Sequence, residues 1–297
     1  MFDLRYHVAS LAAVFLALII GILVGVGISD RGLVDTAKRS LLERRVASLQ
    51  RELDRTRTES ADRARERQAA RTYVNETYPA LMQNRLKNKQ IAVVVIGSVS
   101  GGDRILPAVR RTLDDSGGQQ LRLRALKVPL DVQQVESALK GLPEAKGLRG
   151  RQNLENLGRA VGDELASGGE TPLLDALTPA LVEERTGATK APADGIVVLR
   201  TASPQKGATT RFLIGLYSGL AGTAAPAVGV EPTDAAYTAV PAFRQSGLST
   251  VDDIDQPMGR LSLALLLQGA PAGQYGLKAS AGNGALPPLP TASASGG

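Results

Sequence analysis

The sequence contains no cysteine, no tryptophan and a single histidine. Without cysteine the chain can form neither a disulfide framework nor an iron–sulfur or cysteine-ligated zinc site, and it has no thiol nucleophile. A Ser-His-Asp triad would have to use His7, because no other imidazole is present. These absences argue against an enzyme, and we expect no catalytic residues and no resident cofactor.

Aromatic side chains are also scarce, at 3 % of 297 residues, and basic charge exceeds acidic charge by six. The whole excess lies in residues 1–89, which hold 16 basic and 10 acidic side chains, whereas residues 90–297 hold 19 of each. Nucleic-acid-binding grooves combine basic charge with aromatic stacking platforms. We therefore expect no nucleic-acid partner and interpret the basic segment as one that lies beside a membrane.

A long apolar run is present near the start of the chain. From Val8 to Ile28 no residue carries a charge, and about 20 apolar residues span a hydrocarbon core of about 30 Å. A cleaved signal peptide has a shorter apolar core, of roughly 7–15 residues. The sequence thus predicts an uncleaved single-pass membrane anchor over residues 1–29. The alternative is a buried helix of a soluble domain.

Small residues recur every four positions along this predicted helix, at Ala9, Ala13, Ala17, Gly21, Gly25 and Ser29. Helices in lipid associate through close backbone approach, because apolar burial gives no driving force there. A continuous face of small residues therefore predicts a homo-oligomer, most simply a dimer. The alternative is chance, since Ala and Gly are common in membrane helices.

Residues 30–88 are rich in good helix formers and contain one proline, Pro79. A heptad seam with four-three-four spacing is formed by Leu42, Val46, Leu49 and Leu53. This pattern predicts a basic coiled-coil stalk that continues the dimer and is broken or bent at Pro79. The alternatives are a single solvated helix and a seam that packs on the chain's own domain.

Five basic residues follow the apolar run and are candidates to bind anionic lipid headgroups: Arg31, Lys38, Arg39, Arg44 and Arg45. By the positive-inside rule this flank, taken alone, favours a cytoplasmic C-terminal side. Long domains, however, translocate largely regardless of flanking charge. The charge pattern therefore leaves both orientations open.

Residues 89–278 have the pattern of an α/β domain. Buried strands are predicted at 91–96, 121–128, 195–200 and 227–230, with helices at 104–115, 131–139, 150–166, 209–220 and 259–268. This alternation favours three layers around a mostly parallel sheet. The uncharged stretch 212–230 has the length of a second span, but its four glycines and Pro226 favour a helix, a turn and a strand. The composition of residues 279–297 predicts a disordered tail.

Two segments carry polar groups that suit a ligand. Gly97–Asp103 follows a strand and precedes a helix, where anions often bind, but it lacks the GxGxxG and GK[ST] patterns, which favours a plain turn with Asp103 as helix cap. Asp252, Asp253 and Asp255 are weak candidates for a hard cation such as Ca²⁺ or Mg²⁺. The alternative is a loop that caps the next helix.

Three features together resemble the family of mycobacterial copper transport protein B, which are actinobacterial envelope proteins. They are the opening MFDLRYHVASLAAVFLALIIGILVGVGI, the basic heptad helix, and the segment GLSTVDDIDQPMGRLSLALLL at residues 247–267. The similarity covers most of residues 1–278. The resemblance implies a role in copper efflux and homeostasis, with a pore function in the outer membrane, and a globular domain outside the cytoplasm.

The resemblance places copper ligands on no position of this chain, so copper is implied by the family alone. Cu(I) prefers Cys and Met sulfur and Cu(II) prefers His nitrogen, whereas His7, Met1, Met82 and Met258 are far apart in the sequence.

Two hypotheses follow. One is a membrane-anchored envelope protein with a role in copper homeostasis. The other is a non-enzymatic dimeric scaffold that binds envelope or cell-division proteins through its coiled coil and α/β domain.

Overall fold

The computed structural model describes residues 4–28, 31–102, 104–188 and 190–289. The chain divides into two compact units, Met1–Ala70 and Arg71–Gly297. The first unit consists of helix α1 (Leu4–Ile28) and most of helix α2 (Arg31–Met82). The second contains the end of α2 and an α/β domain, which confirms the predicted fold class.

A helix suits the apolar run of α1 because it pairs the backbone N–H and C=O groups within the segment, where lipid offers them no partner. Its segment His7–Val26 is 20 residues long, has a mean hydropathy of 2.8 and is long and apolar enough to cross a membrane. The side chains of this segment are exposed, so nothing in the first unit covers its apolar surface. Within the described residues no other helix meets the same criteria.

Helix α2 continues through Pro79 to Met82, so the helix is not broken there, whereas a bend at Pro79 stays a prediction. Proline removes one backbone donor from the helix, but the end of α2 is held by packing in the second unit. Met82 is fully buried in the domain core, and the Tyr78 hydroxyl donates to Asp115 Oδ2 at 2.8 Å. The coiled coil along the rest of α2 stays a prediction.

The described part of the domain contains a seven-stranded sheet in the order β3-β2-β1-β4-β5-β6-β7. All neighbours are parallel except β2 and β3, which are antiparallel. The strands are β1 (Gln90–Ile96), β2 (Gln119–Leu126), β3 (Val182–Gly187), β4 (Gly195–Arg200), β5 (Ala227–Val230), β6 (Ser249–Val251) and β7 (Gln274–Tyr275). Both faces of β1 are buried, which explains its unbroken apolar sequence.

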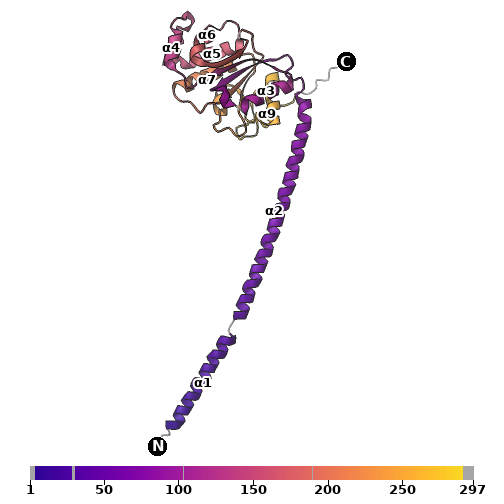
Figure 1. The fold of residues 1–297 in the computed structure, drawn as a ribbon, viewed down its shortest axis with the longest axis vertical. Helices are drawn as coiled ribbons and strands as arrows, with labels where there is room; N and C mark the ends of the chain where they lie inside the picture. Colours follow the sequence, from indigo (N-terminus) through magenta and orange to yellow (C-terminus); the bar gives the residue numbers. More distant parts are fainter. Residues whose placement is uncertain (1–3, 29–30, 103, 189, 290–297) are drawn as a thin grey trace. The chain divides into compact units, whose positions relative to one another are not determined.

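Helices cover the two faces of the sheet (Figure 1). One face packs against α3 (Ile105–Ser116) and α9 (Pro257–Gln268). The other packs against α4 (Val132–Leu139), α5 (Leu154–Ser167), α6 (Pro172–Leu181), α7 (Ala208–Ala221) and α8 (Val240–Gln245). The stretch 212–230 therefore forms the predicted helix, turn and strand, because α7 ends at Ala221 and β5 lies in the core.

Residues 279–289 fall in the segment whose composition predicts disorder, and in the structure they make hydrogen bonds with the edge of the domain. The Ser280 hydroxyl donates to Asp252 Oδ2 at 2.7 Å. Asn283 accepts from the Gln274 backbone at 2.8 Å, and the Ser262 hydroxyl donates to the Ala285 carbonyl at 3.2 Å. These bonds tie the segment to β7 and α9.

Candidate functional site

Strands β1 and β4 lie side by side, and the chain leaves them on opposite faces of the sheet. Helix α3 follows β1 on one face, whereas α7 follows β4 on the other. In open α/β sheets this topological switch point creates a crevice outside the carboxyl ends of the strands, where ligands bind. The strand order therefore directs attention to the residues that follow β1, β4 and β5.

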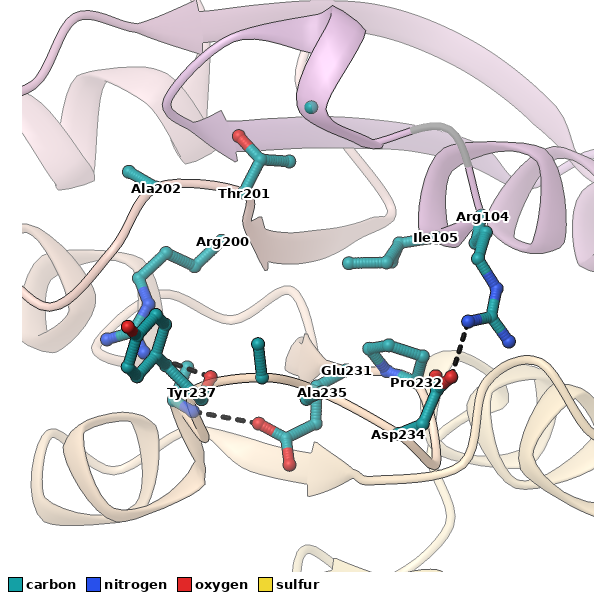
Figure 2. A pocket seen from close by; sticks show the side chains of 13 residues that line it. Arg104, Ile105, Arg200, Thr201, Ala202, Glu231, Pro232, Asp234, Ala235 and Tyr237 are labelled. Atoms are coloured by element: carbon teal, nitrogen blue, oxygen red, sulfur yellow. Dashed lines mark hydrogen bonds and ion pairs between the residues drawn. The ribbon is translucent and has the colours of Figure 1, made fainter.

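A cavity of about 260 Å³ lies at this place. Its lining comes from three segments: the connection from β1 to α3, the end of β4, and the connection from β5 to α8 (Figure 2). Four of the lining side chains are charged: Arg104, Arg200, Glu231 and Asp234. The cavity is therefore a place where charged groups from separate parts of the chain meet.

Thr201 connects the first two segments. Its hydroxyl donates to the Ser98 carbonyl at 2.9 Å. A Cβ at Gly97, whose φ is +110°, would lie 2.6 Å from Thr201 Oγ1, and one at Gly101 would lie 3.1 Å from Thr201 Cβ. The glycines of this turn are thus required for the close approach of the β1 loop to β4, and Thr201 fixes that wall of the cavity.

Two arginines hold the segment that follows β5. Arg200 Nη2 donates to the carbonyls of Tyr237 and Thr238, at 3.2 and 3.0 Å. Arg104 forms an ion pair with Asp234, and in Figure 2 this pair lies on the opposite side of the cavity from Arg200. The hydrogen bond to Asp234 raises the pKa of Arg104, so its charge is permanent at physiological pH.

Glu231 is buried at the base of the cavity, and its carboxylate is fully engaged. It accepts hydrogen bonds from the Ala239 backbone at 2.8 Å and from the Thr238 hydroxyl at 3.0 Å. Lys278 Nζ lies 2.6 Å from Glu231 Oε1. A buried carboxylate is tolerated only when it is paired and hydrogen-bonded, and Lys278 supplies the compensating charge.

The three aspartates proposed as weak cation ligands take different partners. Asp252 accepts from the backbones of Leu277 and Lys278 at 3.0 and 3.2 Å. Asp255 accepts from the Thr233 backbone at 2.6 Å; burial would raise its pKa, but its hydrogen bonds outweigh burial and lower it. Among the described residues no group of three or more His, Asp or Glu side chains is placed to hold a metal ion.

Asp253 is buried like Asp252, but it differs from both neighbours because neither of its carboxylate oxygens has a hydrogen-bond partner in the described structure. Burial raises its pKa to about 7, and the charges of Asp252 and Asp255 add to that effect. Its side chain lies beside the first turn of α9, where Gly259 leaves room for it. Asp253 is therefore partly protonated near neutral pH.

The residues predicted on the first unit lie on α1 and α2. Ala9, Ala13, Ala17, Gly21 and Gly25 are exposed on α1, and a Cβ on either glycine would meet nothing within 4 Å. Ser29 and the predicted cap Asp103 lie outside the described residues. Lys38, Arg39, Arg44 and Arg45 are exposed on α2; Arg31 is helical, but its side chain is outside the described part. Dimer contact and headgroup binding stay predictions.

Of the methionines that the structure describes in the second unit, Met82 and Met258, neither lines the cavity, and Met1 lies outside the described residues. His7 lies on α1, Met82 is in the domain core and Met258 is in the first turn of α9. The charged residues of the cavity were not predicted from the sequence. The available signal was their position, because Arg200 and Glu231 each stand at the end of a buried strand, where ligand-binding residues of parallel sheets occur.

Comparison with known proteins finds a protein family that matches nearly the whole chain. The family described as "Copper transport outer membrane protein, MctB" matches residues 1–287, which is nearly the whole chain. No curated protein matches. The match includes the apolar helix, the long basic helix and the α/β domain together.

Proposed function

Because the chain belongs to the MctB family of copper transport outer membrane proteins, we propose that it acts in copper homeostasis as a membrane-anchored, non-enzymatic envelope protein. The match over residues 1–287 is the observation that carries this proposal. In the proposal α1 anchors the chain and the α/β domain lies outside the cytoplasm. The description of the family as outer membrane proteins favours this location.

Copper is the cargo in this proposal, and the chain contributes to its export without a copper site of its own. Copper ions select sulfur and imidazole ligands, and the chain has no cysteine, one histidine and three methionines that are far apart in the sequence. A pore through a membrane needs a closed barrel or several helices, whereas the described residues of one chain offer one helix long and apolar enough to cross a membrane. Transport therefore requires several copies or a partner.

Deletion of the gene tests the proposal. After growth in copper-supplemented medium, cells that lack the chain should contain more copper than the parent strain, and complementation should restore the parental amount, both measured by mass spectrometry. Zinc in the same samples is the control, because general loss of envelope integrity changes both metals. Equal copper in deletion and parent strains contradicts the proposal.

Conductance of the purified chain in a planar bilayer would assign the transport step to copies of this chain.

A second candidate function, a dimeric scaffold for other envelope proteins, is favoured by the surface of α2. Leu42, Val46, Leu49 and Leu53 are between 51 and 64 % exposed although they follow heptad spacing. Apolar seams of this kind are buried by a second helix in coiled coils. A parallel pair of α2 helices would cover the seam and continue the small-residue face of α1.

Adjacent leucines provide a matched test of this dimer. Leu42 lies on the seam and Leu41 lies off it, and they are 64 and 66 % exposed. Leu42→Asn should lower the fraction of dimer in the purified full chain by about tenfold, because a polar side chain enters the apolar seam. Leu41→Asn should leave it unchanged. Sedimentation in detergent measures both, and equal effects of the two substitutions contradict a seam at Leu42.

A further inference from the structure

We propose that the cavity at the switch point binds a small organic anion, with a compact apolar body and one phosphate or carboxylate group. This inference does not depend on the role in copper homeostasis. It rests on the place of the cavity in the fold, on the charge of its lining and on the mixture of polar and apolar surface that the lining presents.

Among the described residues the lining carries one positive charge that no acidic group neutralises. Lys278 neutralises Glu231, and Arg104 neutralises Asp234. Within the described structure Arg200 has no carboxylate within 4.0 Å, and its guanidinium donates to two backbone carbonyls. A guanidinium has five N–H donors and matches two oxygens of a carboxylate or phosphate. Arg200 therefore keeps both charge and donors for an anion.

Apart from Thr201 and the Tyr237 hydroxyl, the rest of the lining is apolar, which argues against a bare inorganic ion. Ile105, Ala202, Pro232 and Ala235 line the cavity together with the ring of Tyr237, whose side chain is 62 % exposed. The volume of about 260 Å³ is slightly below the range of about 300–1,000 Å³ for drug-sized ligands, so only a small molecule fits. These features select a small ligand that has an apolar body in addition to its charged group.

The pair Arg104–Asp234 gives the cavity a second group that can respond to an anion. The two side chains are 64 and 59 % exposed, and ion pairs on the surface contribute little to stability. An anionic ligand can therefore replace Asp234 as the partner of Arg104. In this arrangement Asp234 competes with the ligand, so its removal strengthens binding.

Calorimetric titration of the full chain with phenyl phosphate tests the proposal, in a maltoside detergent and a phosphate-free buffer. Phenyl phosphate should bind, and benzyl alcohol, benzylammonium and inorganic phosphate should bind more weakly or not at all. If benzoate binds and phenyl phosphate does not, the proposal is also supported, and the charged group of the ligand is a carboxylate. The proposal is overturned if benzyl alcohol, benzylammonium or inorganic phosphate binds as tightly as phenyl phosphate. It is also overturned if none of the probes binds.

Three variants tie the binding to the cavity. Arg200→Gln should weaken phenyl phosphate binding by about tenfold or more, because a hydrogen bond to a charged group is lost. Asp234→Asn should strengthen it several-fold, and Arg211→Gln, on the exposed surface of α7, should leave it unchanged. If Arg200→Gln fails to fold in a thermal unfolding check, Asp234→Asn decides: affinity equal to that of the parent chain overturns the proposal.

Discussion

Asp253 shows how burial changes the chemistry of a single residue. Its carboxylate is enclosed between β6 and α9 without a hydrogen-bond partner in the described structure, and its pKa is raised to about 7. An ionised carboxylate in such a place is costly, so the folded protein holds a proton that the unfolded chain releases. Asp253 thus makes the stability of the domain depend on pH.

The sign of this dependence follows from the two pKa values. Between the ordinary Asp value of 3.8 and the folded value of about 7, the folded state binds more protons, so this contribution to stability falls as pH rises through that interval. Asp253→Asn should raise the melting temperature at pH 8 and flatten its pH profile. The control is Asp114→Asn, on the exposed surface of α3, which should keep the parental profile. A parental profile in Asp253→Asn contradicts this explanation.

At the scale of elements, the pair α5 and α7 depends on glycine. Gly158 and Gly162 on α5 face Gly215 and Gly219 on α7, and a Cβ at Gly215 would lie 1.9 Å from the Glu155 carbonyl oxygen. Close helix contact is possible only because none of the four positions has a side chain. The glycines that argue against a second membrane span therefore also explain how α7 packs closely against α5 in the domain.

Alanine at Gly215 should destabilise the domain. The added methyl group forces the helices apart, and overpacking of this kind costs about 1–3 kcal/mol or more. Gly141 provides the control, since a Cβ there meets nothing within 4 Å, and Gly141→Ala should be neutral within about 0.5 kcal/mol. Urea unfolding followed by circular dichroism measures both variants. Equal stability of the two would contradict the close contact.

The sequence predicted the elements whose burial is visible in their composition. Strands β4 and β5 have the predicted limits, because an apolar run between polar residues marks a strand buried on both faces. The helix predicted at 131–139 is α4, and Asp131 caps it by accepting from the backbones of Gln133 and Gln134. Strand β3 was missed, since five of its six residues are exposed at the sheet edge and no apolar alternation marks it.

The candidate site was not predictable in the same way. Its charged residues come from three connections, and only the order of the strands brings them together. That order depends on pairings between distant segments, which no local pattern records. The sequence predicted a weak cation site from three neighbouring aspartates, Asp252, Asp253 and Asp255. The fold gives each of them a different environment.

At the scale of the whole molecule, the chain combines three kinds of segment with separate tasks. α1 is apolar and suited to a membrane, α2 is basic with an apolar seam, and the α/β domain is electrically balanced and carries a cavity. The family match includes all three. We infer that anchoring and assembly serve the copper-related role, while the chain supplies no copper ligands of its own.

The copper content of cells tests this account most directly. A strain that lacks the gene should accumulate copper, and the complete chain and the Leu41→Asn variant should each restore the parental amount. Leu42→Asn should fail to do so if copies assemble through the α2 seam as we propose, because the substitution puts a polar side chain into that seam. Copper content that is the same with and without the chain would contradict the central claim.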